Sequence, residues 1–331
     1  MIPSPITPSV NFDADGTQHG YLKLPHSRDE SAWGTMLIPI TVVKNGEGPT
    51  ALLTGANHGD EYEGPVALSK LANTLAAEQI HGRVIILPFM NYPAFRAGKR
   101  TSPLDGGNMN RSFPGRPDGS FTEKIADYIY CHLLPLSDYV LDLHSGGKSM
   151  QLLPFAAAHV LEDKAQQARC VAAMQAFAAP YHIMLVELDS VGMYDSAAEA
   201  LGKTFVTTEL GGGGSAIPYT LEIAETGIHN LLVHAGIKHG ALIPRNSVRL
   251  DMSADNCFIT SEHDGLLEMC VNLGDPVSKG QVVARIHDPA RTGVAPEGYR
   301  AGLDGIVALR HFPGLIQCGD AIALIAVAQL D

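Results

Sequence analysis

Residues 51–64 read ALLTGANHGDEYEG and join a short apolar run to a longer segment with helical spacing. The same order recurs from about Thr50 to Gly236, where short apolar runs alternate with longer amphipathic segments. Such alternation is typical of a mostly parallel sheet covered by helices, so we expect a doubly wound α/β fold. The expected strands are Ala51–Thr54, Arg83–Phe89, Tyr139–Leu143, His182–Val186 and Thr204–Thr208, and the expected helices are Pro65–Ala77, Phe121–Leu134, Leu161–Ala178, Ser196–Leu201 and Thr220–Ala235.

The chain divides into two parts of different character. It has 331 residues, which at ~150 residues per domain predicts about two domains. Helical spacing stops near Leu250, and short β-type segments separated by Gly, Asp and Pro follow. We therefore expect an α/β domain over residues 1–250, with the run Met36–Val43 at its edge, and an all-β domain over residues 251–331.

The second domain carries a weak internal repeat. DGLL and GDPV at residues 264–277 are echoed by DGIV and GDAI at residues 304–322. Two similar halves of this kind resemble a biotinyl/lipoyl-type barrel-sandwich domain. Carrier domains of that type present a modifiable lysine between their halves, but the stretch from His287 to Leu303 contains no lysine. We expect a structural role for this domain.

Charge and composition limit the partners that the protein can have. The 35 acidic and 23 basic residues give a net charge of −12, which would repel nucleic acid and an anionic membrane. We therefore expect a small molecule as the partner. The N-terminus lacks a signal-peptide pattern, and the longest apolar stretch, Ala321–Ala328, is too short to span a bilayer. Five scattered cysteines without C-x-x-C spacing indicate reduced thiols and a cytoplasmic protein. Association into a homo-oligomer is left open.

Two expected strand ends carry residues that suit a metal ion. His58 and Glu61 are three apart after the first strand, which puts them on one face of a helical turn, and His144 follows the strand Tyr139–Leu143. Two histidines and a carboxylate are typical of a catalytic zinc with an open position. Asp142 is a candidate to orient His144 if the strand bends, and otherwise a hydrogen-bonded buried carboxylate. The alternative is a polar loop whose acids only favour a helix N-terminus, because a single H-x-x-E match is weak.

A third strand end carries Glu209, followed by the glycines Gly211–Gly214. A carboxylate there, beside a run without side chains, predicts a general base with the substrate backbone close by. The alternative for the glycines is a flexible turn. The run is not a phosphate loop, because no Lys-Ser/Thr follows it and no G-x-G-x-x-G pattern surrounds it.

Residues 96–111 form a polar loop with four basic side chains in an otherwise acidic protein. Arginine binds a carboxylate through a planar fork, so this loop is a candidate for carboxylate recognition. For Arg96 and Lys99 we favour a solvated loop paired to surface acids.

Together these features resemble one protein family, the succinylglutamate desuccinylase/aspartoacylase family, which is itself similar to zinc carboxypeptidases. The resemblance covers about Thr50 to Ala235 and implies a zinc carboxypeptidase-like fold. A β domain at the C-terminus is also found in many members. Four motifs carry the resemblance, in the family's order and approximate spacing: His58-x-x-Glu61, Asn110-Arg111, the strand-end His144 and Glu209-x-Gly211.

The resemblance also implies the roles of the metal ligands and the base. One Zn²⁺ per chain would be bound by His58, Glu61 and His144. Glu209 would be the general base that takes a proton from the attacking water.

The basic loop has implied roles as well. Asn110 and Arg111 would hold the substrate carboxylate. Arg100 best matches the arginine that polarises the scissile carbonyl, with Arg96 as its rival.

Within the family, Asn57–Gly64, Asn108–Gly115 and Leu141–Gly147 most resemble members that deacetylate Nα-acetyl-L-2,4-diaminobutyrate in ectoine breakdown. We therefore expect hydrolysis of a small Nα-acyl amino acid to acetate and diaminobutyrate. The open alternatives are succinylglutamate desuccinylase or aspartoacylase activity, a zinc carboxypeptidase acting on short peptides, and a binding or scaffold protein. The substrate's side-chain ammonium would need an acidic or carbonyl-lined subsite, and the acids named for it, each more simply explained by surface solvation, are Glu187, Asp189, Asp195 and Glu199.

Overall fold

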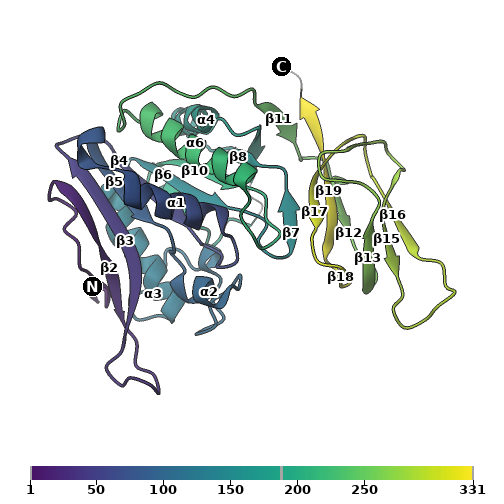
Figure 1. The fold of residues 1–331 in the computed structure, drawn as a ribbon, viewed down its shortest axis with the longest axis horizontal. Helices are drawn as coiled ribbons and strands as arrows, with labels where there is room; N and C mark the ends of the chain where they lie inside the picture. The colour runs from purple at the N-terminus through teal and green to yellow at the C-terminus, as the bar shows by residue number, and fades with distance from the viewer. Residues whose placement is uncertain (1, 187–188, 330–331) are drawn as a thin grey trace.

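The computed structural model describes residues 2–186 and 189–329, and one large sheet runs through most of them (Figure 1). Its centre is parallel, with the strands in the order β5 (Gly82–Leu87), β4 (Thr50–Gly55), β6 (Tyr139–His144) and β10 (Thr204–Glu209). These strands are almost entirely buried, as strands between two helical layers must be. Because β4, β6 and β10 run the same way, their carboxyl ends meet at one edge of the sheet.

One flank of the sheet is antiparallel. β3 (Thr35–Asn45) pairs with β5 and with β2 (Gly16–Pro25), and β1 (Thr7–Pro8) pairs with β2. These strands form one side of the sheet, and β3 contains the run Met36–Val43 that was expected at an edge of the domain. The β2 and β3 pairing is long and leaves the outer face of β2 largely exposed.

The other flank corrects the expectation of a mostly parallel sheet. β8 (Phe155–His159) runs antiparallel to β10, and β9 (Tyr181–Leu185) and β11 (Val248–Asp251) follow in parallel with β8. The sheet is therefore mixed. The strand β8 escaped notice because its sequence, FAAAH, contains three alanines, which favour helices and are depleted in strands.

Helices cover both faces of the sheet, as expected for a doubly wound fold (Figure 1). α1 (Glu63–Thr74), α4 (Lys164–Phe177) and α6 (Pro218–His234) contribute to one buried apolar cluster. α3 (Phe121–Tyr128) and α5 (Tyr194–Ala200) contribute to a second cluster on the opposite face. The remaining helical segments are α2 (Tyr92–Ala97), η1 (Ala77–Gln79), η2 (Met109–Arg111), η3 (Ile129–Leu133) and η4 (Leu134–Leu136).

The chain after β11 is all β, as expected. One layer contains β12, β14, β17 and β19, the other contains β13, β15, β16 and β18, and a separate apolar cluster lies between them. The expected boundary at residue 250 falls within β11, which pairs with both β9 and β19, so the main sheet continues across it. The bounds are β12 (Phe258–Thr260), β13 (Gly265–Met269), β14 (Pro276–Val277), β15 (Val282–His287), β16 (Glu297–Arg300), β17 (Gly305–His311), β18 (Leu315–Ile316) and β19 (Ala321–Gln329).

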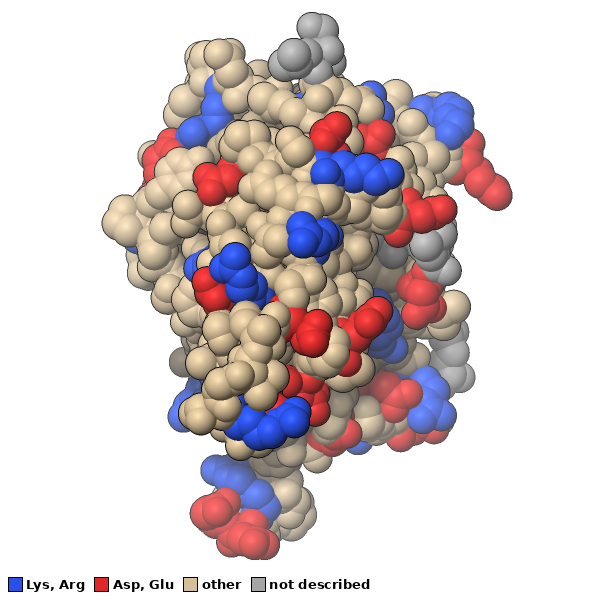
Figure 2. Space-filling view, turned by 90° about the vertical axis from the view of Figure 1, so that its right-hand side faces the viewer, with Lys and Arg blue, Asp and Glu red and all other residues tan. Residues whose placement is uncertain are grey.

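Figure 2 shows the side of the molecule that the C-terminal β layers form, with basic and acidic side chains interspersed over it. Exposed ion pairs such as Arg285–Glu268, at 3.1 Å, and Arg291–Asp288, at 2.9 Å, belong to these layers. Pairs of this kind add only ~0–1 kcal/mol each to stability. None of the described helices has the length and apolar character that crossing a membrane requires.

Candidate active site

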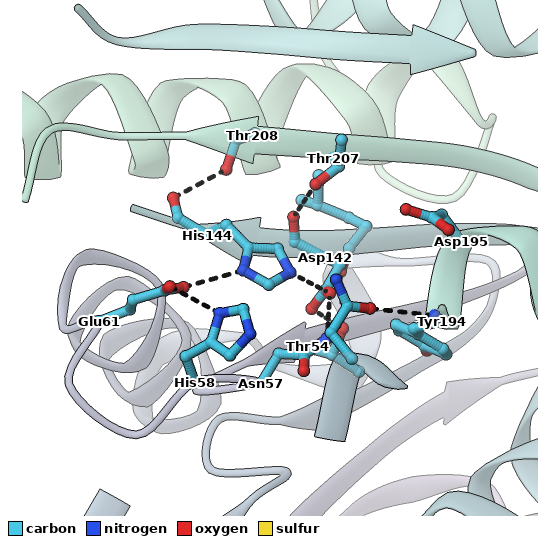
Figure 3. A network of polar contacts seen from close by, with 12 residues as sticks. Thr54, Asn57, His58, Glu61, Asp142, His144, Tyr194, Asp195, Thr207 and Thr208 are labelled. Carbon is cyan, nitrogen blue, oxygen red and sulfur yellow. Dashed lines mark hydrogen bonds and ion pairs between the residues drawn. The ribbon is translucent and has the colours of Figure 1, made fainter. Parts of the chain in front are cut away.

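The three expected metal ligands converge at the carboxyl edge of the sheet (Figure 3). His58 Nδ1 lies 2.7 Å from Glu61 Oε1, and His144 Nδ1 lies 2.9 Å from Glu61 Oε2. All three side chains are buried, and each offers one ligand atom within 4.8 Å of the others. Two imidazoles and a carboxylate are the donors that zinc prefers, so the group fits the metal that the resemblance implies.

The loop that carries His58 is held close to α2 by a glycine. A Cβ atom on Gly59 would overlap the backbone of Ala94 and Phe95. Only glycine lets the two segments approach so closely, and this contact fixes the path of the chain between the two ligands His58 and Glu61.

Asp142 orients His144 from behind. The two residues are two apart on β6, so their side chains lie on the same face, and Asp142 Oδ2 is 2.8 Å from His144 Nε2. Thr54 donates to Asp142 Oδ1 at 2.7 Å, and the Asn57 amide donates to Asp142 Oδ2 at 2.9 Å. The strand needs no bend for this contact. A carboxylate on the far nitrogen of a ligating histidine fixes the ring and leaves Nδ1 for the metal.

The close contacts within the ligand group shift the pKa values of its side chains. Burial disfavours the charged form of Glu61, but His58 and His144 outweigh it and hold the pKa of this carboxyl below its ordinary value. Burial likewise opposes a charge on His144, yet Asp142 and Glu61 raise the pKa of its imidazole well above the usual range. Burial lowers the pKa of His58. Glu61 is therefore an anion in this site, which suits it to bind a cation.

Glu209 lies at the same edge. The register places it beside His144 on β6 and beside Phe155 on β8. Burial, reinforced by the Glu61 carboxylate, raises the pKa of the Glu209 carboxyl to about 8. A carboxyl with a raised pKa is suited to exchange protons near neutral pH, which is the behaviour that a general base requires.

A cavity of about 390 Å³ connects these residues with the basic loop. Its lining includes Arg100, Asn110 and Arg111 as well as the metal ligands and Glu209. Arg100 reaches to 3.7 Å from Glu61 Oε1. Arg96 instead contacts the Tyr92 hydroxyl at 3.3 Å and is absent from the lining, so the geometry favours Arg100 over its rival.

The glycine run forms a tight turn beside the site and is absent from the cavity lining. Gly211–Gly214 all adopt positive φ angles and do not line the cavity. A Cβ atom on Gly212 would overlap the backbone of Met150 and Gly146. The run therefore packs against β7 (Met150–Leu152), where the Gly211 carbonyl accepts from the Leu152 N–H at 2.9 Å.

The residues of the apolar wall of the cavity were not predicted from the sequence. It is built from β7 and β8, with Leu152 and Phe155, and from the C-terminal layers, with Phe258, Leu309 and Leu324. β7 pairs with β17, which brings the C-terminal layers to the cavity. Residues so far apart in sequence meet only through the tertiary fold, and for that reason periodicity alone does not find them.

The four acids considered for an ammonium subsite lie at different positions relative to the cavity. Asp195 is buried and lines the cavity. Glu199 is outside the lining but contacts His159, which belongs to it. Asp189 is exposed, and Glu187 lies outside the described residues.

The fold and the site together define a mixed α/β protein with a two-histidine, one-carboxylate group and a second, half-buried carboxylate at the carboxyl edge of its sheet. The chain belongs to the succinylglutamate desuccinylase/aspartoacylase family, a family of hydrolytic deacylases, because residues 47–235 match the family model for the catalytic domain. The membership expected from the sequence motifs is confirmed.

Several relatives match the chain over nearly its whole length. An N-alpha-acetyl-L-2,4-diaminobutyric acid deacetylase from Halomonas elongata is 60% identical, over 98% of this chain and 95% of its own. The product-bound structure of the ectoine utilization protein EutE (DoeB) from Ruegeria pomeroyi is 60% identical with a TM-score of 0.97, over 98% of this chain and 100% of that one. A succinylglutamate desuccinylase structure from Silicibacter sp. TM1040 is 57% identical with a TM-score of 0.98, over 99% and 100%. The shared architecture therefore includes the C-terminal β layers.

Proposed function

We propose that this protein is a zinc-dependent deacetylase that hydrolyses Nα-acetyl-L-2,4-diaminobutyrate to acetate and L-2,4-diaminobutyrate. The observation that carries the proposal is one cavity that brings His58, Glu61 and His144 together with the half-buried acid Glu209. The relative from Halomonas elongata, at 60% identity, supports the choice of substrate.

The ligands in this proposal are His58, Glu61 and His144, which would hold one Zn²⁺ per chain. Zinc, when bound there, supplies Lewis acidity that polarises the scissile carbonyl and acidifies a water molecule. Asp142 keeps the His144 ring in the orientation that directs Nδ1 toward the metal.

The remaining steps belong to the side chains of the cavity. The Glu209 carboxylate accepts a proton from the attacking water and returns it to the departing amine nitrogen. Arg100 stabilises the negative charge that develops on the carbonyl oxygen. Arg111 and the Asn110 amide bind the α-carboxylate, and Asn110 is itself held by the Tyr194 N–H, which donates to its Oδ1 at 3.0 Å.

Turnover of defined substrates tests the proposal. The full chain, loaded with zinc, should show its highest kcat/KM on Nα-acetyl-L-2,4-diaminobutyrate among a panel that includes N-succinylglutamate, N-acetylaspartate and short peptides. A preference for another member of the panel would contradict the proposed substrate.

A matched pair of variants tests the site itself. Glu209→Gln removes the proton acceptor but no ligand, so kcat should fall by ~100-fold or more while zinc stays near one ion per chain. Glu262→Gln, an exposed position on the C-terminal layers, is the control and should leave both unchanged. Full activity after Glu209→Gln would remove this residue from the mechanism.

We also propose that the fold is of the zinc carboxypeptidase type and that the reaction takes place in the cytoplasm. A metal group at the carboxyl edge of a mixed sheet supports the first point. For the second, all five cysteines are free in the described structure, as is usual in a reducing compartment.

A further inference from the structure

Asp195 is a buried acid in the cavity without a part in the chemistry above. It is the second residue of α5, it is 6% exposed, and it lines the same cavity as the metal ligands. Among the described residues, the acids in that lining are Glu61, Glu209 and Asp195. The first would bind the metal and the second would move the proton, whereas the proposed mechanism gives Asp195 no step.

The two oxygens of the Asp195 carboxylate have different neighbours. Oδ1 accepts from the Ser196 N–H at 2.5 Å and from the Ser196 hydroxyl at 3.1 Å, and Oδ2 faces His159. His159 Nε2 lies 3.8 Å from Asp195 Oδ2, and His159 Nδ1 lies 2.8 Å from Glu199 Oε1. These three side chains are at least nine-tenths buried, with exposures of 4%, 9% and 8% for His159, Asp195 and Glu199. One imidazole is therefore placed between two carboxylates. A cation that reaches this part of the cavity meets acceptors in a low-dielectric environment, where charge pairing is stronger than in water.

The acid also lies next to the residues proposed to bind the α-carboxylate. The Asn110 side chain accepts from the backbone of Tyr194, the residue before Asp195. Gly192 accepts from Phe113 N–H at 3.0 Å, and the rings of Phe113 and Tyr194 stack at 4.7 Å. These contacts hold the segment after Asn110 against the start of α5. Figure 3 places Asp195 beside Tyr194, next to the polar network that leads to the metal ligands.

We propose that Asp195 binds the side-chain ammonium of the substrate and so selects acyl amino acids with a short cationic side chain. This inference rests on the proposed function, because it concerns the same cavity and the same acyl amino acid. An α-carboxylate on Arg111 and an ammonium on Asp195 give a zwitterionic substrate two oppositely charged anchors. An acidic side chain, as in succinylglutamate or acetylaspartate, would be repelled by the same carboxylate.

Two substrates of equal chain length test this assignment. Nα-acetyl-L-2,4-diaminobutyrate and Nα-acetyl-L-2-aminobutyrate differ only by the ammonium group. The unmodified enzyme should favour the first by ~100-fold in kcat/KM, since a buried charge pair is lost with the second. Asp195→Asn should reduce kcat/KM for the charged substrate by ~100-fold, mainly through KM, and leave the uncharged one within about threefold.

Control and rival variants make the result specific. Asp189→Asn, at an exposed position, should change neither value. A selective loss in Glu187→Gln but not in Asp195→Asn would overturn the proposal in favour of the rival acid. If Asp195→Asn fails to fold, Asp195→Glu keeps the charge and extends the carboxylate by one methylene. That variant should shift the preference toward Nα-acetyl-2,3-diaminopropionate, and an unchanged preference would refute the assignment.

The failure of this inference can be told from the failure of the proposed function. If the unmodified enzyme hydrolyses neither substrate, the proposed function fails. If it hydrolyses both equally, the deacetylase activity stands and the ammonium subsite is refuted. An equal loss on both substrates in Asp195→Asn, at unchanged zinc content, would show that Asp195 only supports the fold, and it would also refute the subsite.

Discussion

Asp142→Asn should weaken zinc binding by about tenfold while leaving the protein folded. The Asp142 carboxylate is 1% exposed and is surrounded by donors. Oδ1 accepts from Thr54 at 2.7 Å, and Oδ2 lies 2.9 Å from the Asn57 amide and 2.8 Å from His144 Nε2. The substitution keeps the shape of the side chain, so its effect is electrostatic.

The magnitude follows from the contact with His144. A hydrogen bond to a charged group contributes about 1.5–3 kcal/mol, and one between neutral groups about 0.5–1.5 kcal/mol. Replacing the carboxylate by an amide therefore costs about 1.4 kcal/mol in the orientation of the ring, which is tenfold in affinity. The new amide can keep its oxygen toward Asn57 and His144 and turn its nitrogen toward the Thr54 hydroxyl, which can accept as well as donate, so no larger loss is expected.

Competition with a chromophoric zinc chelator measures the affinity directly. Asp138→Asn is the matched control, because Asp138 precedes β6 at its opposite end and accepts only from Thr50 N–H, at 2.8 Å, in the described side-chain contacts. The control should bind zinc normally. An unchanged affinity in Asp142→Asn, or an equal loss in both variants, would refute the role of Asp142 in orienting His144.

Three further outcomes are expected. Removing zinc with a chelator should lower the melting temperature by about 5 °C, since a ligand at 100 times its Kd stabilises by about 2.7 kcal/mol; an unchanged melting temperature would argue against the site. Gly59→Ala should reduce the free energy of unfolding in denaturant by about 2 kcal/mol, because its Cβ overlaps the backbone of Ala94, whereas Gly298→Ala, whose Cβ meets nothing within 4 Å, should not. Arg100→Lys should lower kcat/KM by ~100-fold and Arg96→Lys by less than threefold, and equal losses would contradict the choice of Arg100.

The central strands and the ligand positions were predictable because local signals agree there. β6 reads YVLDLH and β10 reads TFVTTE, so each strand ends in a side chain that can bind a metal or transfer a proton, His144 and Glu209. In a parallel sheet, such ends come together at one edge whatever the connections between the strands. The sequence therefore predicted that His144 and Glu209 lie at the same edge of the sheet, and the structure adds that their strands, β6 and β10, are neighbours.

The flanking strands and the partners of the site could not be predicted in this way. The short alanine-rich strand β8 runs antiparallel, and neither its composition nor its length indicates that direction. The contacts of Asp142 with Thr54 and Asn57 join residues 88 and 85 positions apart. Sequence spacing cannot predict such contacts, because they depend on which strands are neighbours in the sheet.

The glycine run connects the strand end at Glu209 with the C-terminal layers. Only Leu210 separates Gly211–Gly214 from Glu209, and the run packs against β7, which in turn pairs with β17 of the C-terminal layers. The strand end that holds the proposed base is thus linked through tightly packed backbone to the wall that carries Leu309. A side chain at Gly212 would have to displace β7, and with it that wall. We infer that the glycines maintain the shape of the cavity indirectly, by allowing β7 to pack closely. The C-terminal layers contribute Leu309 and Leu324 to the lining, so we infer that they form part of the substrate site as well as of the fold.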